Sequence, residues 1–359
     1  MLVNKIAIIT SVDYELFGDG TGVVFREQIA TTKYLCKLVQ PYNVKLTIMF
    51  EYAQYLAYEK YAYENCKFSE ANAVIREQLI KLVLSGHDVQ LHYHAQWHDA
   101  IYNAERGEFE LNLNTVDISR LEYMEITTIL RKGKIFLETL LQPYKKEYVC
   151  VAFRAGSWAV KNEEKLCQAL IECGFKVDSS VVPNVKFDEG YVSFKYEHCP
   201  HRYHYWYLDR QLSKKFTKNK KLIEIPIYTI KDNFAFFKYM NIKSLKLKFL
   251  INKLYKHNIS RNAMNFFEKV MKKIFRNYYM ADINSMTSKT LINMIEQVIS
   301  DDDFKDEDII PVMLVGHSKS SYYMNDICLF YDYLNHKYGK NIEYWTLQDF
   351  SNSFAMENN

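Results

Sequence analysis

Strand-like and helix-like segments alternate along this chain, and that alternation limits the fold more than any other feature of its sequence. Apolar runs at 5–12, 45–50 and 309–317 have the composition of buried strands. Between them, segments such as 25–39 and 117–141 carry apolar residues at helical spacing. Strands that alternate with helices form parallel β/α units, in an open sheet or in a barrel.

Ionisable side chains lie at the carboxyl ends of several expected strands, which favours a barrel. In β/α barrels the carboxyl-end rim carries the chemistry, so side chains delivered there by five strands indicate a functional site. The side chains are Asp13, Glu15, His92, His94, Arg154, Asp178 and His317. We therefore predict one barrel domain spanning 1–359.

The composition is that of an ordinary globular protein of 359 residues, 48% hydrophobic and 25% charged. A formal net charge of +3 gives no reason to expect a nucleic-acid partner. The seven cysteines form no CxxC pair, which suits a reducing compartment. Because neither a signal peptide nor an apolar run of about 20 residues is found, we expect a cytoplasmic protein.

A strongly basic region interrupts the alternation. Residues 231–276 hold twelve Lys or Arg against two acids, and 214–221 hold five further lysines. We predict a helical insertion at 232–300. Its charge is explained either by a solvated helical hairpin or by peripheral contact of 214–276 with an anionic membrane or a phosphate-bearing substrate.

The first expected strand ends in two carboxylates on one face. Asp13 and Glu15 stand two residues apart, so an extended backbone points both the same way. Like charges this close need a cation, a shared proton or an arginine between them. The first strand therefore predicts a partner of positive charge.

Histidines at the end of another strand provide such a partner through a shared cation. His92 and His94 share a strand face, and His98 follows four residues later. Neutral imidazoles with one carboxylate make a three-ligand site for a divalent metal that leaves positions open to water. Elsewhere, His198, His201 and His204 fit a substrate-facing loop better than a second metal site.

Five motifs in order resemble those of the polysaccharide deacetylase family, also called the NodB-homology or carbohydrate esterase 4 group. The resemblance covers about 5–230 and 308–350, and the basic region lies outside it. Variants within the motifs are similar to the branch found among capsule and O-antigen biosynthesis proteins. The motifs are SVDYE (11–15), GHDVQLHYHAQW (86–97), FRAGSW (153–158), GFKVDSSVVP (174–183) and LVGHS (314–318).

The resemblance implies a distorted (β/α)₇ barrel and metal-dependent removal of N- or O-acetyl groups. It implies that Asp13 is the general base, held by Arg154, and that His317 is the general acid, tuned by Asp178. Glu15 and His92 would ligate the metal. The motif aromatics Trp158, Trp97 and Tyr14 would contact substrate, with Trp158 walling the acetyl pocket.

Two positions depart from the family pattern. Gln96 stands where the second histidine of His-x-x-x-His belongs, and Glu15 replaces the usual aspartate ligand, which lengthens one arm of the site. We expect His94 to be the third ligand, since it shares a strand face with His92, and we keep His98 in reserve. The expected cofactor is one divalent ion, Zn²⁺ first, with Co, Ni or Fe as alternatives.

The predicted function is hydrolytic removal of an acetyl group, N-acetyl before O-acetyl, in surface polysaccharide biosynthesis. The substrate would be an acetylated sugar, a sugar nucleotide or a lipid-linked glycan. The alternative is a catalytically weak barrel that serves as a carbohydrate-binding or scaffold protein, its metal binding weakened by the change at Gln96.

Overall fold

Seven parallel strands form the centre of the computed structural model, which describes residues 5–216, 221–231, 278–304, 307–320 and 323–356. The first six pair with their neighbours in chain order, and the last strand of the chain pairs with the first. The seven are β1 (Lys5–Tyr14), β2 (Leu46–Glu51), β3 (Asp88–Tyr93), β6 (Ala152–Ala155), β7 (Val177–Asp178), β11 (Leu222–Glu224) and β14 (Ile309–His317).

The ring is closed unevenly, which makes this a distorted (β/α)₇ barrel and confirms the predicted fold. β14 pairs with β1 over nine residues, whereas β7 has only two residues. Past the end of β11, a single parallel bridge from Ile227 to Met313 joins the chain to β14. The side between β11 and β14 is thus the weakly closed one.

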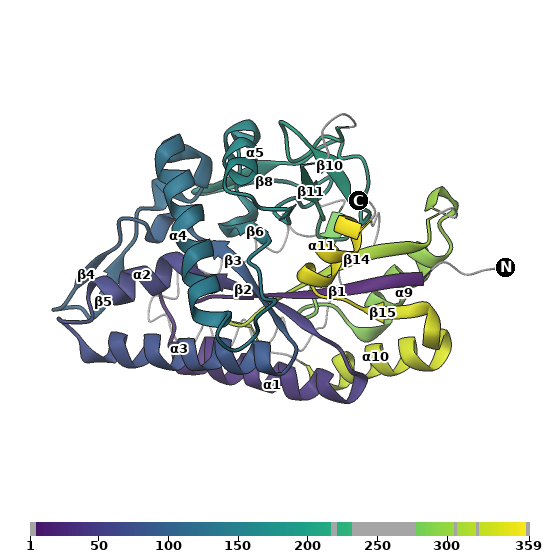
Figure 1. The fold of residues 1–359 in the computed structure, drawn as a ribbon, viewed down its shortest axis with the longest axis horizontal. Helices are drawn as coiled ribbons and strands as arrows, with labels where there is room; N and C mark the ends of the chain where they lie inside the picture. The colour runs from purple at the N-terminus through teal and green to yellow at the C-terminus, as the bar shows by residue number, and fades with distance from the viewer. Residues whose placement is uncertain (1–4, 217–220, 232–277, 305–306, 321–322, 357–359) are drawn as a thin grey trace, which may run out of the picture.

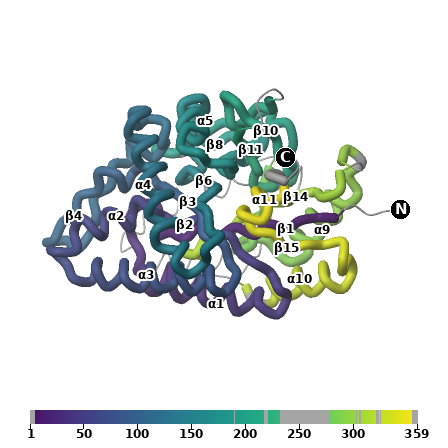
Figure 2. Tube along the Cα trace, viewed as in Figure 1, coloured from purple at the N-terminus to yellow at the C-terminus, as the bar shows by residue number. Residues whose placement is uncertain are grey.

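The apolar composition of the strands explains their central position. Nine of the ten residues of β1 are buried, and all six of β2 are. Parallel strands that are covered on both faces need such nearly continuous apolar sequence. Figure 2 shows β1 beside the closing strand β14 and the short strand β15 (Ile342–Tyr344), so the two ends of the chain meet in the sheet.

Helices cover the outside of the strands (Figure 1). Contacts between neighbouring helices run from α9 through α10 to α1, and from α3 through α4 to α5. The helices are α1 (Thr31–Val39), α2 (Tyr52–Lys60), α3 (Cys66–Leu84), α4 (Tyr123–Leu141), α5 (Glu163–Glu172), α9 (Ser288–Ile299), α10 (Met324–Tyr338) and α11 (Leu347–Met356).

Short antiparallel pairings of strands add to the seven parallel strands. β10 (Trp206–Leu208) extends the sheet beyond β11. The other pairs are β4 (Ile101–Asn103) with β5 (Glu108–Glu110), β8 (Lys186–Glu189) with β9 (Val192–Lys195), and β12 (Thr229–Lys231) with β13 (Tyr278–Met280).

The predicted insertion at 232–300 is described only in its last part. Residues 232–277 lie outside the described residues. From 278 onward the chain is not wholly helical, because β13 pairs with β12 before α9 begins. α9 packs on α10, and the Met294 carbonyl accepts a hydrogen bond of 3.1 Å from the Tyr228 hydroxyl. Residues 278–300 therefore belong to the barrel's own layers.

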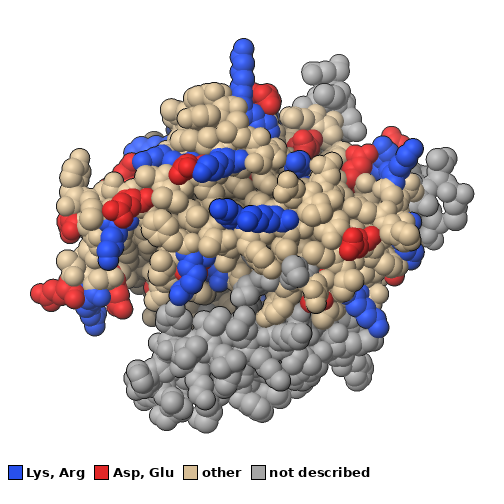
Figure 3. All heavy atoms as spheres, turned by 90° about the horizontal axis from the view of Figure 1, so that it is seen from below, with Lys and Arg blue, Asp and Glu red and all other residues tan. Residues whose placement is uncertain are grey.

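The surface seen in Figure 3 mixes charges of both signs among the described residues. Lys and Arg side chains stand among Asp and Glu side chains there, in keeping with the small formal net charge of +3. No described helix has the length and apolar character to cross a membrane. All seven cysteines carry free thiols.

We predict that Gly133→Val destabilises the protein, because α4 approaches β3 most closely at this glycine. A Cβ atom at Gly133 would lie 2.6 Å from the Leu91 side chain and 3.1 Å from the Tyr52 ring. Overpacking of this kind costs about 1–3 kcal/mol, to be measured by urea unfolding. Lys132→Val on the exposed face of the same helix is the control, with an expected cost near 0.5 kcal/mol. Equal costs would contradict the close packing.

Candidate active site

Buried charged side chains meet at the carboxyl ends of β1, β2, β3, β6 and β14. Three of them are carboxylates, Asp13, Glu15 and Glu51, and each is at most 3% exposed. Burial of unpaired carboxylates is costly, so each needs a positive or hydrogen-bonding partner. The partners of these three carboxylates indicate which chemistry the site can perform.

Asp13 is held by Arg154, as the resemblance implied. Arg154 Nη1 lies 2.5 Å from Asp13 Oδ1. The same guanidinium donates to the Ser11 hydroxyl at 2.9 Å and to the Ser179 carbonyl at 2.9 Å, and is itself fully buried. Burial by itself raises the pKa of Asp13, but the charges of Arg154, His92 and His317 together outweigh it and hold that pKa below its usual range. Asp13 is therefore an ionised base in a fixed position.

His92 has one defined proton. Its Nδ1 lies 2.9 Å from the Arg154 carbonyl oxygen, which can only accept, so Nδ1 carries hydrogen. Its Nε2 faces Glu15 Oε2 at 3.0 Å. Burial alone lowers the pKa of His92, but Asp13 and Glu15 raise it to about 9. Nε2 thus holds either a second proton or a cation shared with Glu15.

His94 is fixed by Glu51, a residue that the sequence analysis did not identify. Glu51 Oε2 accepts from the His94 backbone N–H at 2.9 Å and from Nδ1 at 2.5 Å. Its other oxygen caps α2 by accepting from the Ala53 N–H at 2.8 Å. The signal was present in the sequence, because Glu51 ends an apolar strand as Asp13 does.

The donor set fits a divalent metal. One ligand atom from each of Glu15, Glu51, His92 and His94 can be chosen so that all lie within 4.8 Å of one another. His94 Nδ1 lies 3.2 Å from the same Glu15 oxygen that faces His92. Two imidazoles and carboxylate oxygens are the ligands of Zn²⁺ and similar hydrolytic metals. His92 Nε2 and Glu15 Oε2 face each other at 3.0 Å, so either a proton or a metal cation lies between them. This group of four residues is therefore a candidate metal site.

His317 and Lys319 complete the polar side of the site. His317 Nε2 lies 3.7 Å from Asp13 Oδ2, and Lys319 Nζ pairs with Glu15 Oε1. Burial lowers the pKa of His317, and Lys319 lowers it further against the opposite effect of Asp13. The sequence analysis missed Lys319, whose position two residues past His317 places it on the same rim.

Other predicted site residues lie elsewhere. Asp178 pairs with Glu224 and accepts from Ser180, and no hydrogen bond or ion pair in the described part of the chain joins it to His317. The prediction that Asp178 tunes His317 is therefore not supported by this geometry. Asp282 is the further acid whose charge acts on His317.

Two of the three aromatic residues predicted to contact substrate also lie away from the site. Tyr14 is wholly buried and donates to Gln78 at 2.8 Å, away from the pocket, because it occupies the opposite strand face from Asp13. Trp97 packs in the core against Tyr58 and Phe109. Neither residue lines the cavity beside Asp13 and Glu15, so the structure does not support their predicted contact with substrate.

His98, the reserve ligand, is exposed, and its Nδ1 lies 2.8 Å from the Tyr93 hydroxyl. It is not among the residues that cluster as possible metal ligands. Of the histidines considered for a second site, His204 is buried and stacks on Phe304 at 4.2 Å. The described residues contain no group of metal-binding side chains there.

Trp158 does line a cavity of about 220 Å³ next to Asp13, Glu15 and His317. Its ring meets the His317 ring edge to face, with centroids 5.7 Å apart. Ser157 and Trp158 have φ values of 53° and 54°, the left-handed region that non-glycine residues rarely adopt. Strain of this kind persists where the surrounding structure fixes a functional conformation.

No model of a known protein family matches the sequence, and no curated protein matches it. Solved structures do. A 4-α-glucanotransferase from Thermococcus litoralis matches with a TM-score of 0.51 and 11% identity, over 98% of this chain and 41% of that chain.

Two further solved structures match with lower TM-scores. One is described as a polysaccharide deacetylase from Mycobacterium smegmatis (TM-score 0.47, 11% identity, 99% of this chain and 92% of that chain). The other is an allantoinase (TM-score 0.45, 10% identity, 99% and 92%). At these identities the likeness concerns the fold alone, and one fold serves several reactions. The function is therefore argued from the site.

We predict that Gly156→Ala weakens metal binding. A Cβ atom at Gly156 would lie 2.6 Å from the His94 ring and 2.7 Å from the His94 Cα, and Glu51 prevents the ring from retreating. The affinity for Co²⁺, measured by calorimetry, should fall at least about tenfold. Gly18→Ala is the control, because nothing lies within 4 Å of its added methyl group. Unchanged affinity in Gly156→Ala would contradict the close approach of Gly156 to a metal-binding His94.

Proposed function

We propose that this protein is a metal-dependent hydrolase that removes an acyl group, N-acetyl in the first instance, from a sugar. The observation that carries the proposal is Asp13, an ionised and immobilised carboxylate 3.7 Å from His317 and beside the donor set of Glu15, His92 and His94. A base, an acid and a cluster of metal-type ligands in one cavity are the parts that amide hydrolysis needs.

Glu15, His92 and His94 would hold the ion. Glu51 would fix His94 through its backbone N–H and through Nδ1, the same nitrogen that faces Glu15. When bound, such an ion polarises the carbonyl of the substrate and acidifies water. Arg154 cannot lose its charge, so it keeps Asp13 ionised. Because Arg154 binds Oδ1 of Asp13, the other carboxylate oxygen, Oδ2, is left to face His317.

Asp13 accepts a proton from the attacking water as the water oxygen bonds to the acyl carbon. That proton can pass from Asp13 Oδ2 to the nearby His317 Nε2, which is neutral at rest because its pKa is lowered. His317 then protonates the amine nitrogen as the C–N bond breaks, which leaves a free carboxylic acid and an amino sugar. Trp158 confines His317 from its other side.

The identity of the metal, the cellular compartment and the form of the substrate are proposed from the residues of the chain. The oxygen and nitrogen ligands support Zn²⁺, with Co, Ni or Fe as alternatives. Seven free thiols support a reducing, cytoplasmic setting. In that setting the substrate would be a precursor in surface polysaccharide synthesis, such as a sugar nucleotide or a lipid-linked glycan.

The direct test is acetate release from N-acetylglucosamine, its UDP conjugate and a chitin oligomer, with added Zn²⁺ or Co²⁺ and with EDTA. We expect release from at least one compound, suppressed by EDTA. Asp13→Asn should lower kcat by about 10²–10⁴ with metal content unchanged, since it removes a general base that is not a ligand. Asp99→Asn, on an exposed side chain, is the control.

Two results would overturn the proposal. One is full activity in Asp13→Asn. The other is binding of these sugars without acetate release under any metal condition, which would instead favour the carbohydrate-binding or scaffold alternative.

A further inference from the structure

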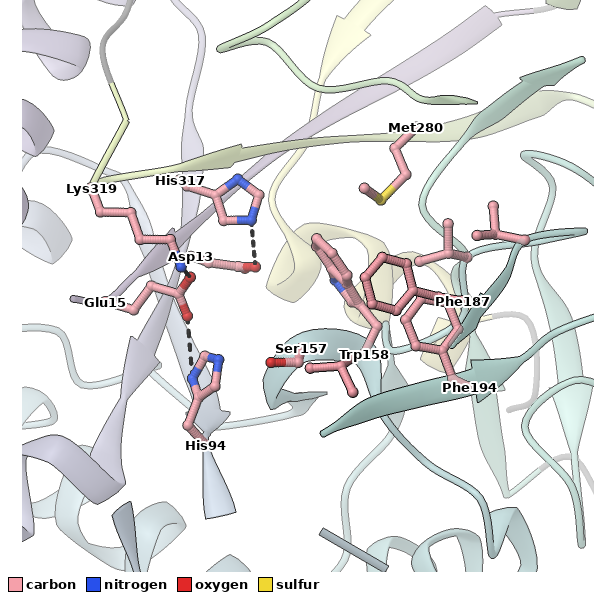
Figure 4. A pocket seen from close by; sticks show the side chains of 13 residues that line it. Asp13, Glu15, His94, Ser157, Trp158, Phe187, Phe194, Met280, His317 and Lys319 are labelled. Carbon is pink, nitrogen blue, oxygen red and sulfur yellow. Dashed lines mark hydrogen bonds and ion pairs between the residues drawn. The ribbon is translucent and has the colours of Figure 1, made fainter. Parts of the chain in front are cut away.

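The cavity beside Asp13 has two unlike sides (Figure 4). On one side stand the charged groups Asp13, Glu15, His317 and Lys319. The side that faces them is built from hydrocarbon. Its residues are Val182, Val185, Phe187, Val192, Phe194 and Met280.

The apolar side, defined by those six residues, is a folded part of the barrel. Phe187 in β8 and Phe194 in β9 stand opposite each other across the hairpin, with stacked rings 5.6 Å apart. Val182 is fully buried, and the Phe194 side chain is 5% exposed. The apolar surface is therefore fixed by packing.

The cavity is larger than an acetyl group requires. Its volume of about 220 Å³ exceeds the roughly 150 Å³ of an apolar protein cavity that holds benzene. A methyl group would fill only a small part of this volume. Figure 4 places Phe187 and Phe194 beyond Trp158, away from Asp13 and Glu15.

The chemistry of this surface disfavours sugar hydroxyls as its occupant. A hydroxyl buried without a hydrogen-bond partner costs about 1–3 kcal/mol. The six side chains that form the apolar side offer no donor or acceptor apart from the weak thioether of Met280. A hydrocarbon chain instead gains free energy there with each methylene that it buries.

We propose that the substrate carries a hydrocarbon chain longer than the methyl of an acetyl group, as an acyl chain of about four to six carbons, seated against the apolar side of the cavity. The inference rests on the proposed function and names the substrate class of that same site. The same chemistry could also enter as an alkyl group on the leaving sugar, and the experiment separates the two sources.

The test compares two substrate series on the metal-loaded protein. The first is N-acetyl-, N-butyryl- and N-hexanoylglucosamine, and the second is N-acetylglucosamine with methyl, butyl and hexyl aglycones. We expect kcat/KM to rise about fourfold for each methylene that is buried, in the first series. A rise in the second series alone would overturn the acyl assignment, and a rise in neither would overturn the proposal.

A binding measurement separates this inference from the hydrolysis itself. Calorimetry with the Asp13→Asn protein, in which turnover is blocked, should show tighter binding of N-hexanoyl- than of N-acetylglucosamine. Equal affinities would contradict the hydrocarbon site even if acetate is released. Tighter binding without any product would leave this inference standing while the proposed function failed.

Two variants on the β8–β9 hairpin locate the effect. Val192→Asp puts a charge on the apolar side and should abolish the preference for the longer chain. Tyr191→Asp adds the same charge one residue away, on a side chain 60% exposed, and should leave the preference unchanged. Loss of the preference in both variants, or in neither, would contradict the assignment of this surface.

Discussion

Buried negative charge is the constraint on which the rest of this site depends. Asp13, Glu15 and Glu51 lie at the ends of adjacent strands, almost without exposure to water. Three carboxylates so placed would destabilise the barrel if they were unpaired. Arg154 compensates the first, Lys319 and the imidazoles the second, and His94 the third. The compensating groups are the ones to which we assign metal binding, positioning and proton transfer, so in this proposal stability and chemistry depend on the same contacts.

The order and register of the barrel strands bring these charged side chains together in one site. Because its strands follow chain order, β1 lies between β2 and β14, and His317 stands in register with Asp13. β3 and β6 bring His92 and Arg154 into register in the same way. The proposed acid, the proposed base and the candidate ligands are thus placed by the sheet, whereas three of the six residues on the apolar side of the cavity come from the β8–β9 hairpin.

Strand periodicity accounts for both the successes and the errors of prediction from the sequence. The spacing of Asp13 and Glu15, and of His92 and His94, predicted pairs on one face, and the structure brings both pairs together. The same rule places Tyr14 on the opposite face, so its assignment to substrate was wrong. Glu51 and Lys319 belong to none of the five motifs. Their positions at or just past strand ends place them on the rim, and tertiary pairing with His94 and Glu15 then gives them a role. Asp178 is satisfied by Glu224, a contact between strands that no spacing along the chain reveals.

The central claim is that Glu15, His92 and His94 hold one divalent cation, and titration of chelator-treated protein with Co²⁺ tests it most directly. Calorimetry should show one equivalent bound by the original protein and an affinity more than about a hundredfold weaker in His94→Ala. His98→Ala should bind as the original does, because His98 points to Tyr93 instead. Absence of Co²⁺ and Zn²⁺ binding, or equal affinities in the original protein and in His94→Ala, would contradict the account.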